Sequence, residues 1–262
     1  DYDRMTSLFY WANPLATYFL VSLLASLHTY RTSLTKASRG WLLVSGILMS
    51  GLLLTYSRAA WVIALIVLGA MLWSSRERRM EALRLAKVLS IGLALTVLTI
   101  GVRQVAYKHP TIDVQSRISE SASSTSVKDR IQYWRESSVL FSERPLTGWG
   151  IGTYAEVHPQ VQSSPTTAGN NPHNSFLQGL VELGVVGGAA YLVLIGGWLW
   201  QGWRILRNTQ RSEIALTAWL IVTVIGLHSW LDLISNYPVL IIAGAVRLAV
   251  AIASPRYEFR LK

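Results

Sequence analysis

Long apolar runs constrain this chain more than any other feature of its sequence. A helix needs about 20 apolar residues to cross the hydrocarbon core of a bilayer. Only 15% of the 262 residues are charged, whereas about a quarter are charged in a typical soluble domain. The runs are too long and too uniformly apolar for the alternating strands of a membrane barrel. We therefore predict seven membrane-spanning helices, at about residues 13–30, 40–56, 59–73, 88–102, 174–200, 214–231 and 237–254.

The stretch 40–73 is apolar almost throughout, and it could be one helix or two. A single helix of this length would extend about 50 Å at 1.5 Å per residue, which is too long for one bilayer. Two helices would form a tight hairpin with Ser57 and Arg58 at its tip. We predict the hairpin.

The distribution of basic residues supports the hairpin and sets the orientation. The segments 31–39, 74–87 and 201–213, together with the C-terminal tail, hold more than half of the 24 Lys and Arg residues. Seven spans put all four segments on one side, which the positive-inside rule identifies as the cytoplasm. These basic segments account for the net charge of +10, so a nucleic-acid partner is not required to explain it. Because the N-terminus falls outside and no signal peptide precedes Asp1, we expect upstream spans to be missing from this chain.

The segment 103–173 is much longer than an ordinary connector, and such segments usually carry function or are disordered. Residues 126–129 have the spacing of a helix capping box, which predicts a helix over about 127–141 that ends before Pro145. The predicted fold is all-α: a polytopic membrane helical bundle with a large, partly helical external (periplasmic) loop. Its predicted domains are 1–102 with four spans, 103–173 as the external loop, and 174–262 with three spans and a cytoplasmic tail.

Arg58 lies where two predicted spans meet. An arginine at membrane depth is costly and usually faces a cavity or a partner, although it can also extend to the lipid headgroups. Because the short tip provides no long loop to carry the side chain away from the bilayer, we favour a functional role for Arg58.

Arg130 and Arg135 lie on the helix predicted over 127–141. Asp129 and Glu136 are their neighbours in the sequence, and charged runs on helices are usually solvated and salt-bridged. From the residues alone, a solvated face is the stronger interpretation for both arginines.

His173 follows Pro172 and immediately precedes the long span at 174–200. Histidine changes its charge near neutral pH, so at a membrane boundary it is a plausible proton-transfer group. A helix-capping or interfacial histidine would occupy the same place in the sequence. The residues by themselves leave both interpretations open.

Glu182 lies within that predicted span. With Ser175 and Gln178 it follows i, i+3, i+7 spacing, so the three would form one polar stripe along a helix. An acid within a span normally faces the bundle interior, where it could orient the histidine indirectly, line a cavity, or only fix the packing of helices. Gly184 and Gly188 have the spacing that allows close contact with another helix.

Metal and nucleotide chemistry have little support in the sequence. The chain has no Cys, and its five His residues show no metal-ligand spacing. The glycine-rich stretch 148–152 lacks the strand–helix context of a nucleotide-binding fingerprint. We therefore predict neither a metal nor a cofactor.

Five short motifs, taken in order along the chain, resemble elements of the O-antigen ligase and O-antigen polymerase superfamily. They extend over about residues 13–190, and together they are specific for the superfamily but not for one member. One departure is Ala59, which stands where the superfamily commonly has glycine. The motifs are Asn13-Pro14-Leu15-Ala16; Ser57-Arg58-Ala59-Ala60-Trp61; Asp129-Arg130 followed by Trp134; Pro145-Leu146-Thr147-Gly148-Trp149-Gly150; and His173-Asn174-Ser175-Phe176-Leu177 with Glu182-Leu183-Gly184 and Gly187.

This resemblance implies a multi-pass protein of the bacterial inner (cytoplasmic) membrane. Such proteins move a glycan from an undecaprenyl-diphosphate carrier to an acceptor hydroxyl on the periplasmic face. The acceptor is lipid A–core in ligases, another carrier-linked glycan in polymerases, and a protein Ser or Thr in oligosaccharyltransferases. Members of the superfamily usually have more spans than this chain, which fits the expectation that upstream spans are missing.

The resemblance also implies roles for individual residues. Arg58 and Arg130 would bind the diphosphate, because the planar guanidinium matches phosphate oxygens and stays charged, and they would stabilise the leaving diphosphate. His173 would be the base that takes the proton of the acceptor. No metal is needed if arginines neutralise the diphosphate. The further substrate-binding candidates are Arg135, Asn174 and Glu182.

Two other classes of function stay open at this point. Some members of the superfamily have been described as bicarbonate transporters, and basic groups in a membrane cavity could bind a small anion. A transporter should show paired repeats with broken helices, and the sequence shows no internal repeat. In a scaffold protein, Arg58 and Glu182 would only pair neighbouring spans.

Overall fold

The computed structural model describes residues 12–33, 37–107, 125–163, 171–208 and 212–232. Within these ranges all regular secondary structure is helical, which confirms the predicted all-α membrane fold. The span predicted at 237–254 and the cytoplasmic tail lie outside the described residues.

Five of the other six predicted spans each correspond to one helix, and the sixth, 174–200, falls on α8, which is interrupted at Gly184. Two helices are long and apolar enough to cross a bilayer, Arg78–Ala106 and Ser175–Arg207, while Ser38–Leu54, Arg58–Ser74 and Glu213–Ser229 are apolar but shorter. The helices of the structure are α1 Ala12–Thr32, α2 Ala37–Leu54, α3 Arg58–Ser74, α4 Arg78–Tyr107, α6 Thr125–Glu143, α7 Tyr154–Val157, the 3-10 helix η2 His158–Gln160, α8 Ser175–Arg207 and α9 Glu213–Ser229.

The chain divides into two compact units, which we describe separately. The first unit contains α1–α4, α9 and the last residues of α8. The second unit contains α6, α7, η2, most of α8 and the turn that follows α9.

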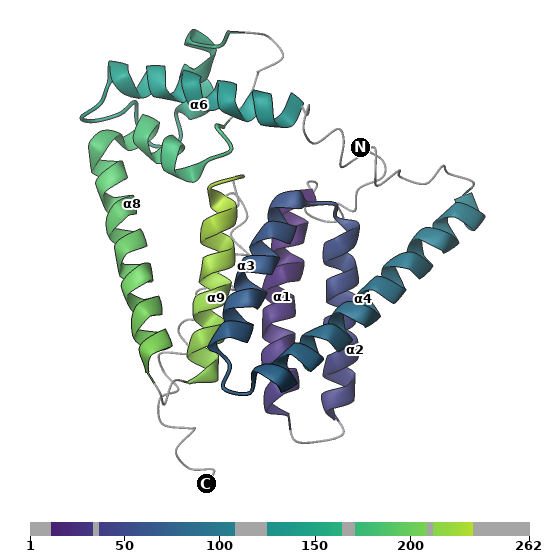
Figure 1. The fold of residues 1–262 in the computed structure, drawn as a ribbon. Helices are drawn as coiled ribbons and strands as arrows, with labels where there is room; N and C mark the ends of the chain where they lie inside the picture. Colours follow the sequence, from purple (N-terminus) through teal and green to yellow (C-terminus); the bar gives the residue numbers. More distant parts are fainter. Residues whose placement is uncertain (1–11, 34–36, 108–124, 164–170, 209–211, 233–262) are drawn as a thin grey trace. The chain divides into compact units, whose positions relative to one another are not determined.

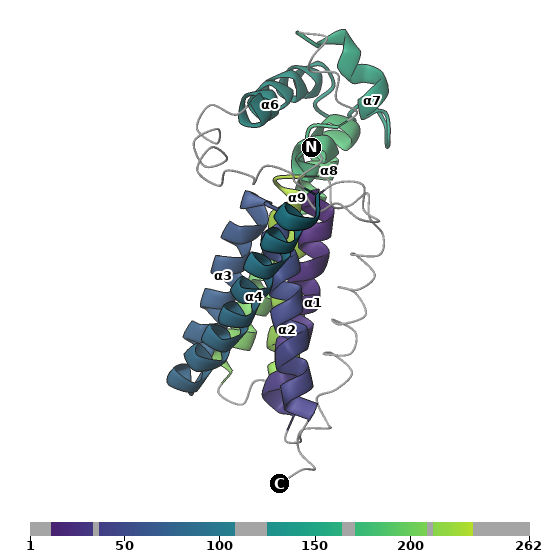
Figure 2. The same cartoon turned by 90° about the vertical axis from the view of Figure 1, so that its right-hand side faces the viewer.

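The first unit is a helical bundle built around α1 (Figures 1 and 2). Its α1 has four fully buried leucines, and α2 packs against both α1 and α4. The side chain of Thr17 on α1 lies 2.6 Å from Nδ1 of His228 on α9. Lipid tails are as apolar as leucine, so helices in a bilayer associate through close van der Waals packing, and the leucine face is the main packing surface of α1. The four leucines are Leu20, Leu23, Leu24 and Leu27.

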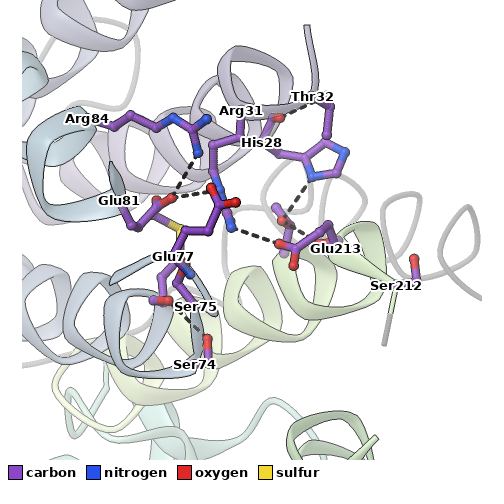
Figure 3. A network of polar contacts seen from close by, with 12 residues as sticks. His28, Arg31, Thr32, Ser74, Ser75, Glu77, Glu81, Arg84, Ser212 and Glu213 are labelled. Atoms are coloured by element: carbon purple, nitrogen blue, oxygen red, sulfur yellow. Dashed lines mark hydrogen bonds and ion pairs between the residues drawn. The ribbon is translucent and has the colours of Figure 1, made fainter. Parts of the chain in front are cut away.

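An ion-pair network joins three helices at one end of this bundle (Figure 3). Arg31 in the last turn of α1 contacts Glu81 through Nε at 3.0 Å and Glu213 through Nη2 at 3.0 Å. Arg84 also contacts Glu81, at 3.4 Å. Glu81 is only 1% exposed, and removing one partner of such a buried pair typically costs about 3–5 kcal/mol. The network therefore brings together the segments 31–39, 74–87 and 201–213 or their immediate neighbours, as expected for segments that share one side of the membrane.

The side of the membrane that these three segments face is a prediction that cysteine labelling can check. The chain has no native Cys, so a single cysteine reports its position without background. Ser75→Cys should react only with reagents that reach the cytoplasm, and Ser138→Cys on α6 only with impermeant reagents added from outside. If both positions label from the same side, the predicted topology is wrong.

Candidate functional site

The tip between α2 and α3 is the tight hairpin that the sequence predicts. Ser57 caps α3, because its Oγ accepts a hydrogen bond from the backbone N–H of Ala60 at 3.4 Å. The same hydroxyl donates to Oδ1 of Asn13 at 2.8 Å. The indole N–H of Trp61 donates to the carbonyl of Leu52 at 3.3 Å, which ties the end of α2 to the start of α3. The first two sequence motifs thus form one structure in the first unit.

Arg58 is the first residue of α3, and its side chain is exposed. Among the residues that the structure describes, it has no ion-pair partner. The N-terminus of α3 adds the positive end of a helix dipole at the same place. Arg58 is therefore available for an anionic ligand, and the arrangement favours one.

In the second unit, α8 folds back on itself at Gly184. Gly184 has φ 62° and ψ −153°, which no helical residue adopts. Phe176 and Tyr191 are 15 positions apart, which would separate them by about 22 Å in a straight helix, yet their ring centroids lie 5.5 Å apart. The prediction of one continuous helix over 174–200 is therefore wrong: 175–183 and 185–207 are two arms of a helical hairpin.

The glycine-rich turn after α6 packs on the bend of this hairpin. Trp149 and Gly150 donate backbone hydrogen bonds to the carbonyls of Val181 at 3.0 Å and Glu182 at 2.9 Å, and Val185 donates to the carbonyl of Pro145 at 2.8 Å. The turn thus satisfies backbone groups that the break in α8 would otherwise leave without partners.

Gly148 and Gly184 make this close approach possible. A Cβ on Gly148 would lie 2.4 Å from the backbone carbon of Glu182, and a Cβ on Gly184 would lie 2.5 Å from the carbonyl oxygen of Leu146. Both glycines also have positive φ, a conformation that other residues adopt at a cost. Gly184 therefore serves a backbone bend, and the predicted contact with another helix is wrong for this residue.

Gly148→Ala should strongly destabilise the second unit. The expected loss is about 2–4 kcal/mol in the free energy of unfolding, since both the backbone clash and the positive φ contribute. Gly152→Ala is the matched control, because Gly152 also has positive φ but has open space around its Cβ position. Thermal unfolding of the purified protein should rank Gly148→Ala well below Gly152→Ala. Equal midpoints would show that the backbone contact contributes no stability.

Glu182 has a buried carboxylate that anchors this turn. It accepts hydrogen bonds from the backbone N–H of Gly152 at 3.0 Å, the N–H of Tyr154 at 3.4 Å and the side chain of Gln178 at 2.8 Å. Glu182 is 7% exposed, and among the described residues its hydrogen bonds go to Gly152, Tyr154 and Gln178 and not to His173. Glu182 therefore stabilises the hairpin rather than orienting the histidine.

His173 has a different acidic partner, Asp232. Its Nδ1 lies 2.9 Å from Oδ1 of Asp232, which belongs to the turn after α9. The backbone N–H of His173 donates to Oδ1 of Asn171 at 3.1 Å, and the residue has a positive φ of 49°. The side chain is 35% exposed. A histidine held at Nδ1 by a carboxylate, with its other nitrogen directed elsewhere, has the arrangement of an oriented general base.

Helix capping is carried out by the next residue, Asn174. Its Oδ1 accepts a hydrogen bond from the backbone N–H of Leu177 at 3.0 Å, which is the usual N-cap contact. The alternative in which His173 only caps the helix is therefore wrong.

The sequence did not lead us to Asp232. It falls just after the predicted span 214–231, 59 positions from His173 along the chain. The only available signal was an acid at the end of a span, on the side predicted to hold His173.

Helix α6 confirms the predicted loop helix, although it begins at Thr125, so Ser126 lies inside the helix and is not its cap. The indole N–H of Trp134 donates to the carbonyl of Pro172 at 3.1 Å, and the ring of Tyr133 lies 5.8 Å from that of His173. Arg130 precedes these two residues by three and four positions. It therefore shares the face of α6 that contacts the His173 segment.

Arg130 is half-buried and Arg135 is exposed. Within the described ranges neither arginine forms an ion pair, and the exposure of Arg135 fits the solvated face that the sequence favours. Glu136, the expected partner, instead lies 2.7 Å from Nε2 of His158, and both side chains are buried. Among the described residues the guanidinium of Arg130 therefore has no acidic partner, and it lies on the face of α6 from which Tyr133 and Trp134 contact the His173 segment.

Glu136 is the polar centre of the second unit. Burial alone would raise its pKa, but hydrogen bonds from Gln132, Ser163 and His158 outweigh this effect and lower the pKa below the ordinary value of a glutamate. A carboxyl group whose pKa is lower in the folded state stabilises the fold at pH values above its ordinary pKa, about 4.3. This stabilisation is lost as the pH falls through the pKa of the folded state.

Acidification below about pH 4 should therefore destabilise the second unit through Glu136. Glu136→Gln should be less stable than wild type at neutral pH and should lose less stability on acidification. Hydrogen exchange of α6 amides between pH 3 and 7 would measure this. If the stability of Glu136→Gln fell with pH as steeply as that of wild type, Glu136 would not be the source of the acid sensitivity.

No group of three or more metal-ligating side chains occurs in the part of the chain that the structure describes. The charged groups of the second unit described above are arginines, histidines and single carboxylates. They suit recognition of an anion and transfer of a proton.

Comparison with known proteins agrees with these motifs. A family model for O-antigen ligases matches residues 42–192. An uncharacterised protein of Haemophilus influenzae is 26% identical over 151 residues, which cover 54% of this chain and 38% of that protein. The match thus covers well under half of the length of this relative. Because the family model matches more than half of the chain and includes the hairpin tip, the glycine-rich turn and the His173 segment, this membrane protein belongs to the O-antigen ligase family.

Proposed function

We propose that the complete protein transfers a glycan from an undecaprenyl-diphosphate carrier to an acceptor hydroxyl at the external (periplasmic) face of the bacterial inner membrane. The observation that carries this proposal is the pairing of His173 with Asp232, a base and its orienting carboxylate. Family membership supports glycan transfer as the type of reaction, and lipid A–core is the acceptor that best fits a ligase.

This geometry supports the following reaction. Asp232 accepts a hydrogen bond from Nδ1–H of His173, which leaves the lone pair of Nε2 to take a proton. As the acceptor oxygen attacks the anomeric carbon of the glycan, its proton passes to Nε2 and a new C–O bond forms. The bond between the anomeric carbon and the diphosphate breaks, and undecaprenyl diphosphate leaves with the electron pair. General-base assistance of this kind typically contributes about 10²–10⁴-fold in rate.

The leaving diphosphate needs positive charge. Arg58 and Arg130 supply it, because each lacks an ion-pair partner among the described residues and each guanidinium can bind phosphate oxygens in two-point fashion. Two such groups stabilise the charge that builds on the leaving group, so the reaction does not need a metal. Arg135 adds positive charge on α6, while Asn174 and Glu182 support the site through the cap and the anchored turn.

Reconstitution tests the proposal. The complete protein in liposomes, mixed with carrier-linked glycan and lipid A–core, should form the joined product, and excess chelator should not reduce the rate. Absence of product with lipid A–core, with a second carrier-linked glycan and with protein acceptors would overturn it.

The same liposomes separate transfer from transport of a small anion. A transporter would need paired broken helices, and among the described helices the break at Gly184 has no counterpart. We therefore expect no uptake of labelled bicarbonate above that of empty liposomes.

A further inference from the structure

Three aromatic side chains form a cluster in the second unit, and two of them lie on the segments that carry His173 and Asp232. The rings of Phe176 and Trp230 are stacked, with centroids 5.9 Å apart and planes inclined by 8°. Tyr191 packs edge-on against Phe176 at 5.5 Å, and its hydroxyl is hydrogen-bonded to Trp230. The cluster exists because α8 folds back at Gly184, which brings the second arm of the hairpin alongside Phe176.

Trp230 is held rigidly yet stays accessible. One face of its indole is covered by Phe176, and the side chain is still 43% exposed. The face that points away from Phe176 is therefore the one that a ligand could contact. A tryptophan that is stacked on one side and hydrogen-bonded at its edge has little freedom to turn, so the open face is preorganised.

The position of this face is set by two short segments. Trp230 is two residues from Asp232 in the turn after α9, and Phe176 is three residues from His173 at the start of α8. Because the histidine and the aspartate are themselves in contact, the stacked pair and the proposed base are built from the same two segments. A molecule bound on Trp230 would therefore contact the same two segments that carry the proposed base and its carboxylate.

We infer that the open face of Trp230, backed by Phe176, binds a pyranose ring of the acceptor glycan by stacking. This inference rests on the proposed function. One side of a pyranose ring presents mainly C–H groups, which carry slight positive charge and pack well on the electron-rich face of an indole. The hydroxyl groups point outward from the ring edge, so a stacked sugar can direct one hydroxyl toward His173.

Tryptophan at a membrane surface also has a simpler role, as an anchor at the level of the headgroups. Trp200 on the second arm of α8 is a suitable comparison, since its side chain is 59% exposed and it lies 27 positions from His173. Trp230 differs from a simple anchor in having one face backed by a parallel ring. An anchor and a stacking surface predict different kinetics.

The first test is steady-state kinetics with the complete protein in liposomes. Trp230→Leu keeps an apolar side chain of substantial volume but removes the flat face, so the KM for lipid A–core should rise about two- to tenfold. The kcat and the KM for the carrier-linked donor should stay within twofold of wild type. Trp230→Phe should largely restore the acceptor KM, and Trp200→Leu should change neither constant.

Other kinetic outcomes would overturn the inference. A fall in kcat with an unchanged acceptor KM would mean that Trp230 only positions Asp232. An equal effect of Trp230→Leu and Trp200→Leu would mean that both side chains only anchor the protein in the bilayer.

A binding measurement separates this inference from the proposed reaction. The probe is core oligosaccharide released from lipopolysaccharide by mild acid, titrated calorimetrically into the His173→Asn protein, which needs no catalysis to bind. Adding Trp230→Leu should weaken binding about two- to tenfold. If wild type transfers nothing but this difference persists, the proposed function fails and the stacking surface stands. If the oligosaccharide does not bind, or binds equally to both proteins, the stacking surface is wrong.

Discussion

His173→Asn should lower the rate of glycan transfer by about 10²–10⁴-fold, the usual contribution of a general base. Asparagine at this position can keep a polar contact with Asp232, but it cannot accept a proton near neutral pH. The helix cap should be unaffected, because Asn174 provides it. Initial rates at saturating donor and acceptor, measured on the reconstituted complete protein, would check this prediction.

Asp232→Asn is the companion variant. It leaves the size of the side chain nearly unchanged but removes the negative charge that holds Nδ1–H of His173 toward it. We expect a clear loss of rate that is not additive with His173→Asn, because residues that act as a unit lose their function together. Near wild-type transfer by a folded, membrane-inserted His173→Asn protein would show that the base is another group or the acceptor itself.

Arg58→Lys and Arg130→Lys should each lower the rate of transfer by about 10²-fold, which is the size of effect seen when one donor to a developing negative charge is lost. Lysine keeps the charge but loses the planar guanidinium that binds two phosphate oxygens at once. The loss should appear mainly in kcat, because the charge on the diphosphate grows as the glycosidic bond breaks.

Arg135→Lys is the matched control on the same helix. Arg135 is exposed, whereas Arg130 shares the face of α6 on which Trp134 binds the carbonyl of Pro172. We therefore expect a change of less than about threefold for Arg135→Lys, which is the size of a contribution below 1 kcal/mol from an exposed charge. If Arg130→Lys and Arg135→Lys behave alike, Arg130 has no special role at the diphosphate.

Several parts of the fold could be predicted because they depend on local rules. The length limit of a membrane helix required a turn within 40–73, and the structure has it at Ser57. The basic segments were expected to share one side, and Arg31, Glu81 and Glu213 now lie in one network. The helix predicted over 127–141 appears as α6, although α6 begins at Thr125, before the residue expected to cap it.

The path of α8 could not be predicted from the same rules. Hydropathy shows only that residues 174–200 are apolar. One straight helix and a helical hairpin are equally compatible with that pattern. The break at Gly184 depends on backbone hydrogen bonds with a turn that lies far away in the sequence: Trp149 and Gly150 donate to carbonyls of α8, and the carbonyl of Pro145 accepts from Val185. Without these partners the exposed backbone groups would favour a continuous helix.

The partners of the acidic residues were also a matter of tertiary structure. Glu182 was placed near His173 by helical spacing, but the fold directs it to the glycine-rich turn. Glu136 was expected to pair with a neighbouring arginine, but it binds His158 in the interior. Spacing along a helix restricts which residues share a face, and it does not say what that face meets.

The sequence by itself therefore determined the membrane-spanning class, the hairpin tip, the loop helix and the family, because hydropathy, charge and short motifs are properties of neighbouring residues. Only the tertiary structure decided which carboxylate meets His173. Asp232 reaches it across 59 positions of chain, and no pattern in the sequence relates residues that far apart. The aromatic stack of Phe176 and Trp230 depends on the same long-range contact, because the turn that carries Asp232 also carries the indole.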